Sequence, residues 1–186
     1  MATVELPPDS QKRLIELARA TIEDFVCDIE RAPAKIDDPY LLTKNYGAFV
    51  SLHRGRELRG CIGTCFPSEP LCDIVVEMTQ AAASRDRRVA AVSAAELGQI
   101  DIEISVLSPL FRADDPPALE IGTHGLYISS GSSRGVLLPQ VATEYGWTME
   151  KFLRQTCVKA GLPKDAWKSP DTEVLAFTTL IIKEAQ

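Results

Sequence analysis

The sequence predicts an α+β fold with a largely antiparallel sheet, packed helices and room for a smaller lobe. Residues 100–107 alternate apolar and polar side chains, as a half-buried strand does, and residues 48–62 have a hairpin pattern. Residues 11–30 repeat apolar side chains at helical spacing. Because strands and helices do not alternate regularly, a doubly wound sheet is the less favoured alternative. A chain of 186 residues favours one domain spanning residues 1–186.

Capping residues delimit the predicted helices. The first helix, residues 11–30, follows Ser10 as its N-cap and ends before Pro33, where a loop begins. Further helices are expected over residues 71–84 and from Thr148, as N-cap, to a stop at Gly161. Additional strands are expected at residues 126–128, 136–138 and 174–183.

The register of the hairpin follows from its apolar residues. A three-residue loop at 54–56 places Leu52 opposite Leu58 and Ala48 opposite Ile62, with the apolar side chains on one face. A loop one residue shorter mixes the two faces, so we favour the longer loop. The polar face then carries Ser51, His53, Glu57, Arg59 and Cys61.

Composition excludes several classes of function. The chain has 20 Lys and Arg against 26 Asp and Glu, giving a net charge of −6, which argues against binding nucleic acid or an anionic membrane through the whole chain. No apolar run approaches the ~20 residues of a membrane span, and no secretory signal is recognisable at the N-terminus. We therefore expect a cytoplasmic protein. Two arginine clusters, at 54–59 and 85–88, offer a local anion site.

Cofactor and metal sites are not expected. The five cysteines are an odd number without an export signal, so reduced thiols are favoured over a disulfide framework. Cys61, Cys65 and Cys72 lack the paired spacing of a structural zinc site and the three-cysteine spacing of a radical iron-sulfur enzyme. The sequence has no phosphate-binding Gly-rich loop, no Walker pattern and no Gly-x-Ser-x-Gly elbow.

The densest chemical signal is the segment from Leu58 to Gly63. In a strand, Arg59 and Cys61 lie on one face about 7 Å apart, where a guanidinium favours the thiolate. Gly60 and Gly63 let a ligand or another backbone come close. A reactive Cys61 is one interpretation; the other, favoured by spacing alone, is a small packed cysteine beside glycines that mark a bulge.

Other candidate residues lie elsewhere in the chain. His124, in a Gly-flanked turn before a strand, has a side chain suited to acid–base chemistry, although a backbone-bonded turn histidine is the commoner case. Gln140 and Glu144 are spaced to share one helix face, which is equally typical of a solvated surface. Glu103 points outward from the strand at 100–107 and is a further candidate binding residue.

Four motifs in order identify a family resemblance. The LRGCIG segment at 58–63, GTHGL at 122–126, LLPQVA at 137–142 and CVKAGLP at 157–163 resemble the AMMECR (AMME chromosomal region) family, of the bacterial and archaeal AmmeMemoRadiSam system protein A type. The resemblance covers nearly the whole chain. It implies an α+β fold with an antiparallel sheet and a smaller lobe, and a Cys61–His124 site. The family pattern of an aromatic residue and prolines after Asp-x-Arg is absent at residues 86–91.

The resemblance implies no established reaction. It implies association with a Memo-like protein and a radical SAM protein, or a role in transcription, replication, repair or translation. Our first hypothesis is a cytoplasmic enzyme or enzyme component with Cys61 as nucleophile, Arg59 as its electrostatic partner or anion clamp, and His124 as general base. The second is a non-catalytic protein-binding module using the same surface. Nucleic-acid binding is least favoured at this net charge.

Overall fold

The computed structural model describes residues 3–32 and 35–184. The described chain divides into two compact units. The larger unit contains residues 4–107 and the end of the chain from residue 180, and the smaller unit contains residues 108–179 together with Thr3. Each unit has a hydrophobic core of its own. Both units combine helices with antiparallel strands, which confirms the predicted α+β class.

The first helix of the larger unit, α1 (Pro8–Cys27), begins earlier than the sequence predicts. Pro8 occupies the first helical turn, where its fixed φ favours a helix and its missing N–H costs nothing. Ser10 therefore lies inside the helix, and its hydroxyl donates to Asp38 Oδ2 at 2.8 Å instead of capping. Asp28, in the left-handed conformation at φ 53°, ends α1 before Pro33, which lies outside the described residues.

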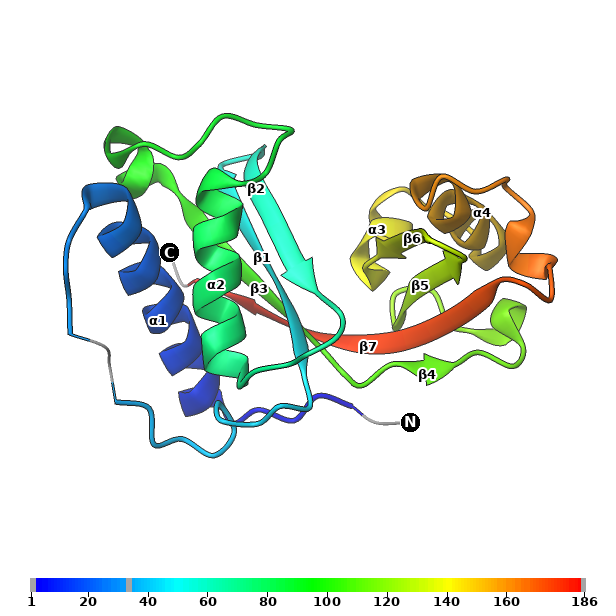
Figure 1. Ribbon diagram of the computed structural model, residues 1–186, viewed down its shortest axis with the longest axis horizontal. Coiled ribbons are helices and arrows are strands. Elements are labelled where there is room, and N and C mark those ends of the chain that lie inside the picture. The colour runs from blue at the N-terminus through cyan, green and yellow to red at the C-terminus, as the bar shows by residue number, and fades with distance from the viewer. Residues whose placement is uncertain (1–2, 33–34, 185–186) are drawn as a thin grey trace. The chain divides into compact units, whose positions relative to one another are not determined.

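A second helix and three strands complete the core of the larger unit. Helix α2 (Leu71–Ser84) has the predicted bounds. Strands β1 (Gly47–Arg54), β2 (Glu57–Thr64) and β3 (Asp101–Leu107) pair antiparallel in the order β2-β1-β3. Helices α1 and α2 cover one face of these strands (Figure 1). The buried strand residues on that face are Ala48, Val50, Leu52, Ile102, Ile104 and Val106.

The predicted register of the hairpin is wrong. Arg54 pairs with Glu57, so the loop has two residues, and a bulge between Leu52 and His53 then shifts the pairing by one residue. Leu52 consequently lies opposite Gly60, whereas the three-residue loop placed it opposite Leu58. The short loop does not mix the faces, because the extra residue of the bulge restores the alternation beyond it.

The smaller unit has its own strands and helices. Strands β5 (His124–Ser130) and β6 (Ser133–Leu137) form a hairpin, and β7 (Glu173–Lys183) pairs with β5 and with β4 (Phe111–Arg112). Helices α3 (Pro139–Glu144) and α4 (Met149–Lys159) contribute buried side chains to the core of this unit. Thr148 caps α4 as predicted, its hydroxyl accepting the Lys151 N–H at 3.3 Å. Three short 3₁₀ helices, Ala94–Gln99, Pro116–Ala118 and Ala166–Lys168, were not predicted.

At Gly60, β2 approaches α2 closely. A Cβ atom at this position would overlap the carbonyl oxygen of Ala82 in α2. The backbone of a neighbouring element therefore occupies the space beside Gly60, which is one of the two roles that the sequence allowed for this glycine. Because a helix carbonyl cannot move away as a flexible side chain can, β2 and α2 can pack at this distance only when residue 60 is glycine.

We predict that Gly60→Ala lowers the free energy of unfolding by about 2–3 kcal/mol, because the added methyl group forces the packed helix and strand apart. Urea unfolding followed by circular dichroism measures this change. Gly98→Ala is the matched control, since a Cβ atom at Gly98 meets nothing within 4 Å; its expected effect is below about 0.5 kcal/mol. Equal effects of the two substitutions would contradict this packing argument.

Candidate functional site

A row of polar side chains crosses the helix-free face of the larger sheet. Ser51 in β1 lies directly opposite Cys61 in β2 and directly opposite Glu103 in β3. Directly opposed residues of antiparallel strands project from the same face. Because their neighbours Val50 and Leu52 point into the core under the helices, these three side chains lie on the other face. We call Cys61, Ser51 and Glu103 the polar row.

Cys61 is a half-exposed thiol within hydrogen-bonding distance of a hydroxyl. Ser51 Oγ donates to Cys61 Sγ at 3.1 Å. The other cysteines differ from Cys61: Cys65, Cys72 and Cys157 are buried, and Cys27 is exposed. Burial raises the pKa of the Cys72 and Cys157 thiols, which disfavours their reactive thiolate forms. Cys61 is thus the partly exposed cysteine of the five, and its sulfur accepts a hydrogen bond from a side chain on the same face of the sheet.

Glu103 brings a carboxylate to the same face. Its side chain is partly exposed and forms an ion pair with Lys183 Nζ at 3.1 Å. Lys183 is the last residue of β7 and belongs to the larger unit. The polar row therefore presents a thiol, a hydroxyl and a carboxylate side by side, with an ammonium group next to the carboxylate. Of these groups, the sequence singled out Cys61 and Glu103 but missed the contribution of Ser51.

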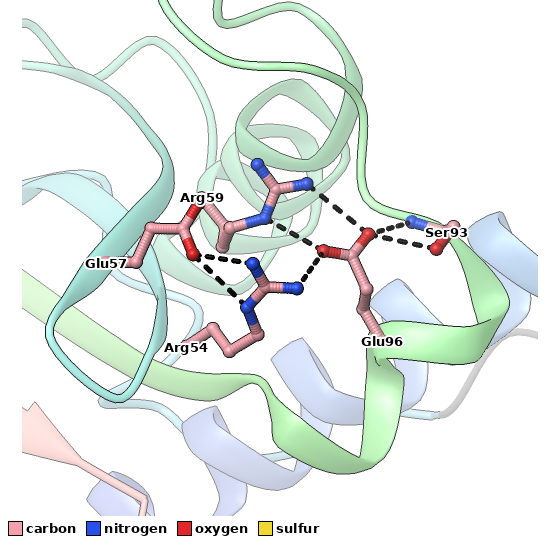
Figure 2. Close-up of polar contacts among 5 residues, drawn as sticks. All are labelled: Arg54, Glu57, Arg59, Ser93 and Glu96. Atoms are coloured by element: carbon pink, nitrogen blue, oxygen red, sulfur yellow. Dashed lines mark hydrogen bonds and ion pairs between the residues drawn. The ribbon is translucent and has the colours of Figure 1, made fainter.

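Arg59 is directed to a carboxylate in the segment before β3. Its Nε donates to Glu96 Oε1 at 2.9 Å, and its Nη2 donates to Glu96 Oε2 at 3.3 Å (Figure 2). Arg54 also reaches Glu96, at 3.2 Å, and pairs with Glu57 at 2.6 Å. Arg59 is buried and its charge is matched by Glu96. The structure thus gives Arg59 a role in tying the hairpin to the Glu96 segment, and its action on the thiol stays a prediction.

Glu96 is the centre of this network. It also accepts hydrogen bonds from the backbone N–H of Ser93, at 3.0 Å, and from the Ser93 hydroxyl, at 2.9 Å. Hydrogen bonding from Arg59, followed by that from Ser93, lowers the pKa of Glu96 from 4.5 to about 2. The five residues in Figure 2 therefore hold the tip of the β1–β2 hairpin against the start of the 3₁₀ helix at Ala94–Gln99.

A second ion pair forms hydrogen bonds with the backbone of Cys61. The Cys61 N–H donates to Asp86 Oδ2 at 2.9 Å, and Arg88 Nη2 donates to the Cys61 carbonyl oxygen at 3.2 Å. Asp86 and Arg88 are themselves paired at 2.7 Å. The Arg88 guanidinium holds the pKa of the buried Asp86 carboxyl well below its usual range. The arginine cluster at 85–88 was visible in the sequence, but its contact with Cys61 was not, because the two segments are far apart in the chain.

The remaining predicted site residues lie in the smaller unit or serve packing. His124 begins β5, is 2% exposed, accepts the Glu120 N–H on its Nδ1 at 3.0 Å and packs edge-on against Phe111. Gln140 and Glu144 both lie in α3, half-buried and exposed respectively. Because His124 and Cys61 belong to different units, their shared site stays a prediction. In the larger unit, a Cβ atom at Gly63 would overlap the Phe49 ring.

Two features are absent from the described residues. Within residues 3–32 and 35–184, no group of three or more His, Cys, Asp and Glu side chains is arranged to hold a metal ion. The same residues include no helix with the length and apolar character needed to traverse a bilayer.

We predict that Glu96→Gln flattens the acid limb of the stability profile. Because the pKa of Glu96 is lowered in the folded chain, its ionised form stabilises that chain above about pH 4.5, and this contribution disappears as the pH falls towards about 2. Urea unfolding at several pH values between 5 and 2 measures the slope. Glu77→Gln is the control, since no ion pair or hydrogen bond is described for that exposed side chain. Parallel profiles for Glu96→Gln and wild type would refute this assignment.

Comparisons with known proteins agree with the motif pattern. The AMMECR1 family model matches residues 15–182. A protein of Methanothermobacter thermautotrophicus is 40% identical over 190 residues, covering 99% of each chain, and protein TK0174 of Thermococcus kodakarensis is 40% identical, covering 92% of this chain and 88% of that protein. The crystal structure of the uncharacterized protein PH0010 from Pyrococcus horikoshii matches with a TM-score of 0.86 and 36% identity, covering 94% of this chain and 91% of that one. The chain belongs to the AMMECR1 family.

Proposed function

We propose that the chain is an enzyme, or the thiol-bearing component of an enzyme, whose reactive group is Cys61. The observation that carries this proposal is the polar row, in which the Cys61 sulfur is partly exposed and lies 3.1 Å from the Ser51 hydroxyl. A buried cysteine that only fills space needs neither exposure nor a hydrogen-bond donor at its sulfur. The row lies on the face of the sheet that α1 and α2 leave uncovered.

The proposed chemistry is nucleophilic. The thiolate of Cys61, the nucleophilic form of cysteine, attacks an electrophilic carbon of the substrate. A carbon–sulfur bond forms as the bond from that carbon to a leaving group breaks, and the leaving group takes the electron pair. A hydrogen bond from Ser51 stabilises negative charge on the sulfur. Glu103, in the same row, accepts the proton that the thiol loses. In this proposal Arg59 acts indirectly, by holding the hairpin to Glu96.

Partners and location complete the proposal. We assign the chain to the cytoplasm, where thiols stay reduced, and to an assembly with a Memo-like protein and a radical SAM protein. This assembly is proposed only from the family resemblance carried by the motifs at 58–63, 122–126, 137–142 and 157–163. The alternative is a non-catalytic module that binds a partner through the polar row and the hairpin. The fixed charges around Glu96 favour that alternative, since a rigid charged tip suits recognition of a partner surface.

We predict that iodoacetamide alkylates Cys61 at pH 7 about three- to tenfold faster than it alkylates glutathione, because one hydrogen bond to the thiolate is worth roughly 1 kcal/mol. Peptide mass spectrometry of the time course resolves each cysteine. Cys27, the exposed thiol of the same chain, reports in the same sample on simple accessibility. A rate at Cys61 no greater than that of glutathione would end the nucleophile proposal.

Two variants locate the origin of that reactivity. Ser51→Ala removes the hydroxyl that donates to the sulfur and is expected to slow alkylation of Cys61 about two- to fivefold. Ser84→Ala is the matched control, because the Ser84 hydroxyl bonds a carbonyl oxygen of its own helix, at the end of α2. The rate at Cys27 should stay constant in both variants.

We predict that the immobilised chain retains a Memo-like protein, and that Cys61→Ser retains it equally well while losing turnover in the reconstituted assembly. An enzyme component binds its partner through a surface larger than one thiol, so loss of the sulfur should affect chemistry and spare binding. Cys27→Ser is the matched thiol control. Full turnover by Cys61→Ser with intact binding would favour the non-catalytic module, and failure to retain the partner would contradict the proposed assembly.

A further inference from the structure

We infer that Arg88, held beside Cys61 by Asp86, binds an anionic group of the molecule that meets the Cys61 thiol, either a carboxylate or a phosphate. This inference rests on the proposed function, since it names the class of substrate that Cys61 meets. It also replaces Arg59 with Arg88 as the cation of the Cys61 site. All the groups involved belong to the larger unit.

Asp86 fixes the guanidinium of Arg88 through several bonds. Asp86 Oδ1 accepts from the Arg88 backbone N–H at 3.1 Å and from Arg88 Nε at 2.9 Å, and Asp86 Oδ2 accepts from Arg88 Nη2 at 2.7 Å. The side chain of Asp86 is 3% exposed, so it is held by its surroundings. Two parallel bonds between a carboxylate and a guanidinium fix both position and orientation. Arg88 is therefore preorganised, and binding a ligand costs it little side-chain entropy.

Arg88 is also in contact with Cys61. Its Nη2 donates to the Cys61 carbonyl oxygen at 3.2 Å, while Asp86 holds the N–H of the same residue. The pKa of Arg88 is raised, mainly by its hydrogen bond with Asp86 and additionally by Cys61. A ligand anion on Arg88 therefore lies next to the residue that carries the thiol.

One edge of the Arg88 guanidinium can still bind a ligand. Asp86 and Cys61 accept hydrogen bonds from Nε and Nη2, and Nη1 donates to no group of residues 3–32 and 35–184. The Arg88 side chain is 61% exposed, in contrast to the buried Asp86. A planar guanidinium with free N–H donors is well suited to carboxylate and phosphate oxygens. The arrangement thus joins a fixed cation to an open face.

Other arginines of the two clusters lack this combination. Arg54 has all three guanidinium nitrogens bonded to Glu57 and Glu96. Arg59 is bonded to Glu96 and is only 10% exposed, so it offers no open edge to a ligand. Arg85 ends α2, where its charge complements the helix C-terminus. Arg87 is exposed, and no fixed partner is described for its side chain. Arg88 is both held in place and open to a ligand, so it is the arginine to which we assign the anion.

We predict that the ratio of Cys61 alkylation rates with iodoacetate and iodoacetamide falls about two- to fivefold in Arg88→Gln, because the charged reagent loses a favourable partner next to the thiol. The two reagents differ mainly in charge, so a general loosening of the fold changes both rates and leaves their ratio unaltered. Arg87→Gln is the matched control for loss of one positive charge, and its ratio should stay within about 1.5-fold of wild type.

The outcomes separate this inference from the proposed function. Slow alkylation of wild-type Cys61 by both reagents defeats the proposed function, whereas fast alkylation with an equal ratio in wild type and Arg88→Gln defeats the anion assignment. A second measurement needs no substitution: acetate and inorganic phosphate, titrated separately into the wild-type chain, identify the anion, and at least one of them should shift the amide NMR signals of Cys61 and Arg88 and leave that of Cys27 in place. The absence of these shifts overturns the inference even if Arg88→Gln does not fold.

Discussion

The bulge in β2 determines which side chains meet in the larger unit. It adds one residue to β2 between the positions opposite Leu52 and His53, so every later residue of β2 moves along β1 by one position. Gly60 is thereby placed against α2, where no side chain fits, and Cys61 is placed across from Ser51. Without the bulge, Cys61 would lie opposite Val50, a core residue, and the polar row would not exist.

Two carboxylates then hold this strand at either side of Gly60. Glu96 takes the charge of Arg59, and Asp86 takes the charge of Arg88 and the backbone N–H of Cys61. Both carboxylates have lowered pKa values, and in each case hydrogen bonds from an arginine are the main cause. A carboxylate held in this way costs little to bury, because its charge and its lone pairs are satisfied. The polar contacts therefore keep the local backbone in one conformation.

The sequence was sufficient to predict the longer helices and strands but not the register in which the strands pair. The helix at 71–84 and the strand at 100–107 were predictable because each has a continuous period of apolar residues. The hairpin loop was wrong by one residue, since apolar patterning assumes a regular strand and the bulge breaks that regularity. The first helix was displaced for a different reason, because Ser10 bonds Asp38, a partner 28 positions away.

Local sequence patterns were also insufficient to predict the contacts of the candidate site. Arg59 and Cys61 were paired by strand spacing alone, but a long arginine side chain bonds the carboxylate it can reach, and for Arg59 this is Glu96. The contributions of Ser51 and Arg88 depend on strand pairing and on contacts across many residues, which no local pattern encodes. Asp86 and Arg88 together form a clip on the backbone of Cys61, at the edge of the sheet. Among residues 3–32 and 35–184, β2 pairs with β1 alone, so its outer backbone groups offer a template for a foreign strand. The clip occupies both the N–H and the carbonyl of Cys61, and so blocks edge-to-edge aggregation at this point of the sheet.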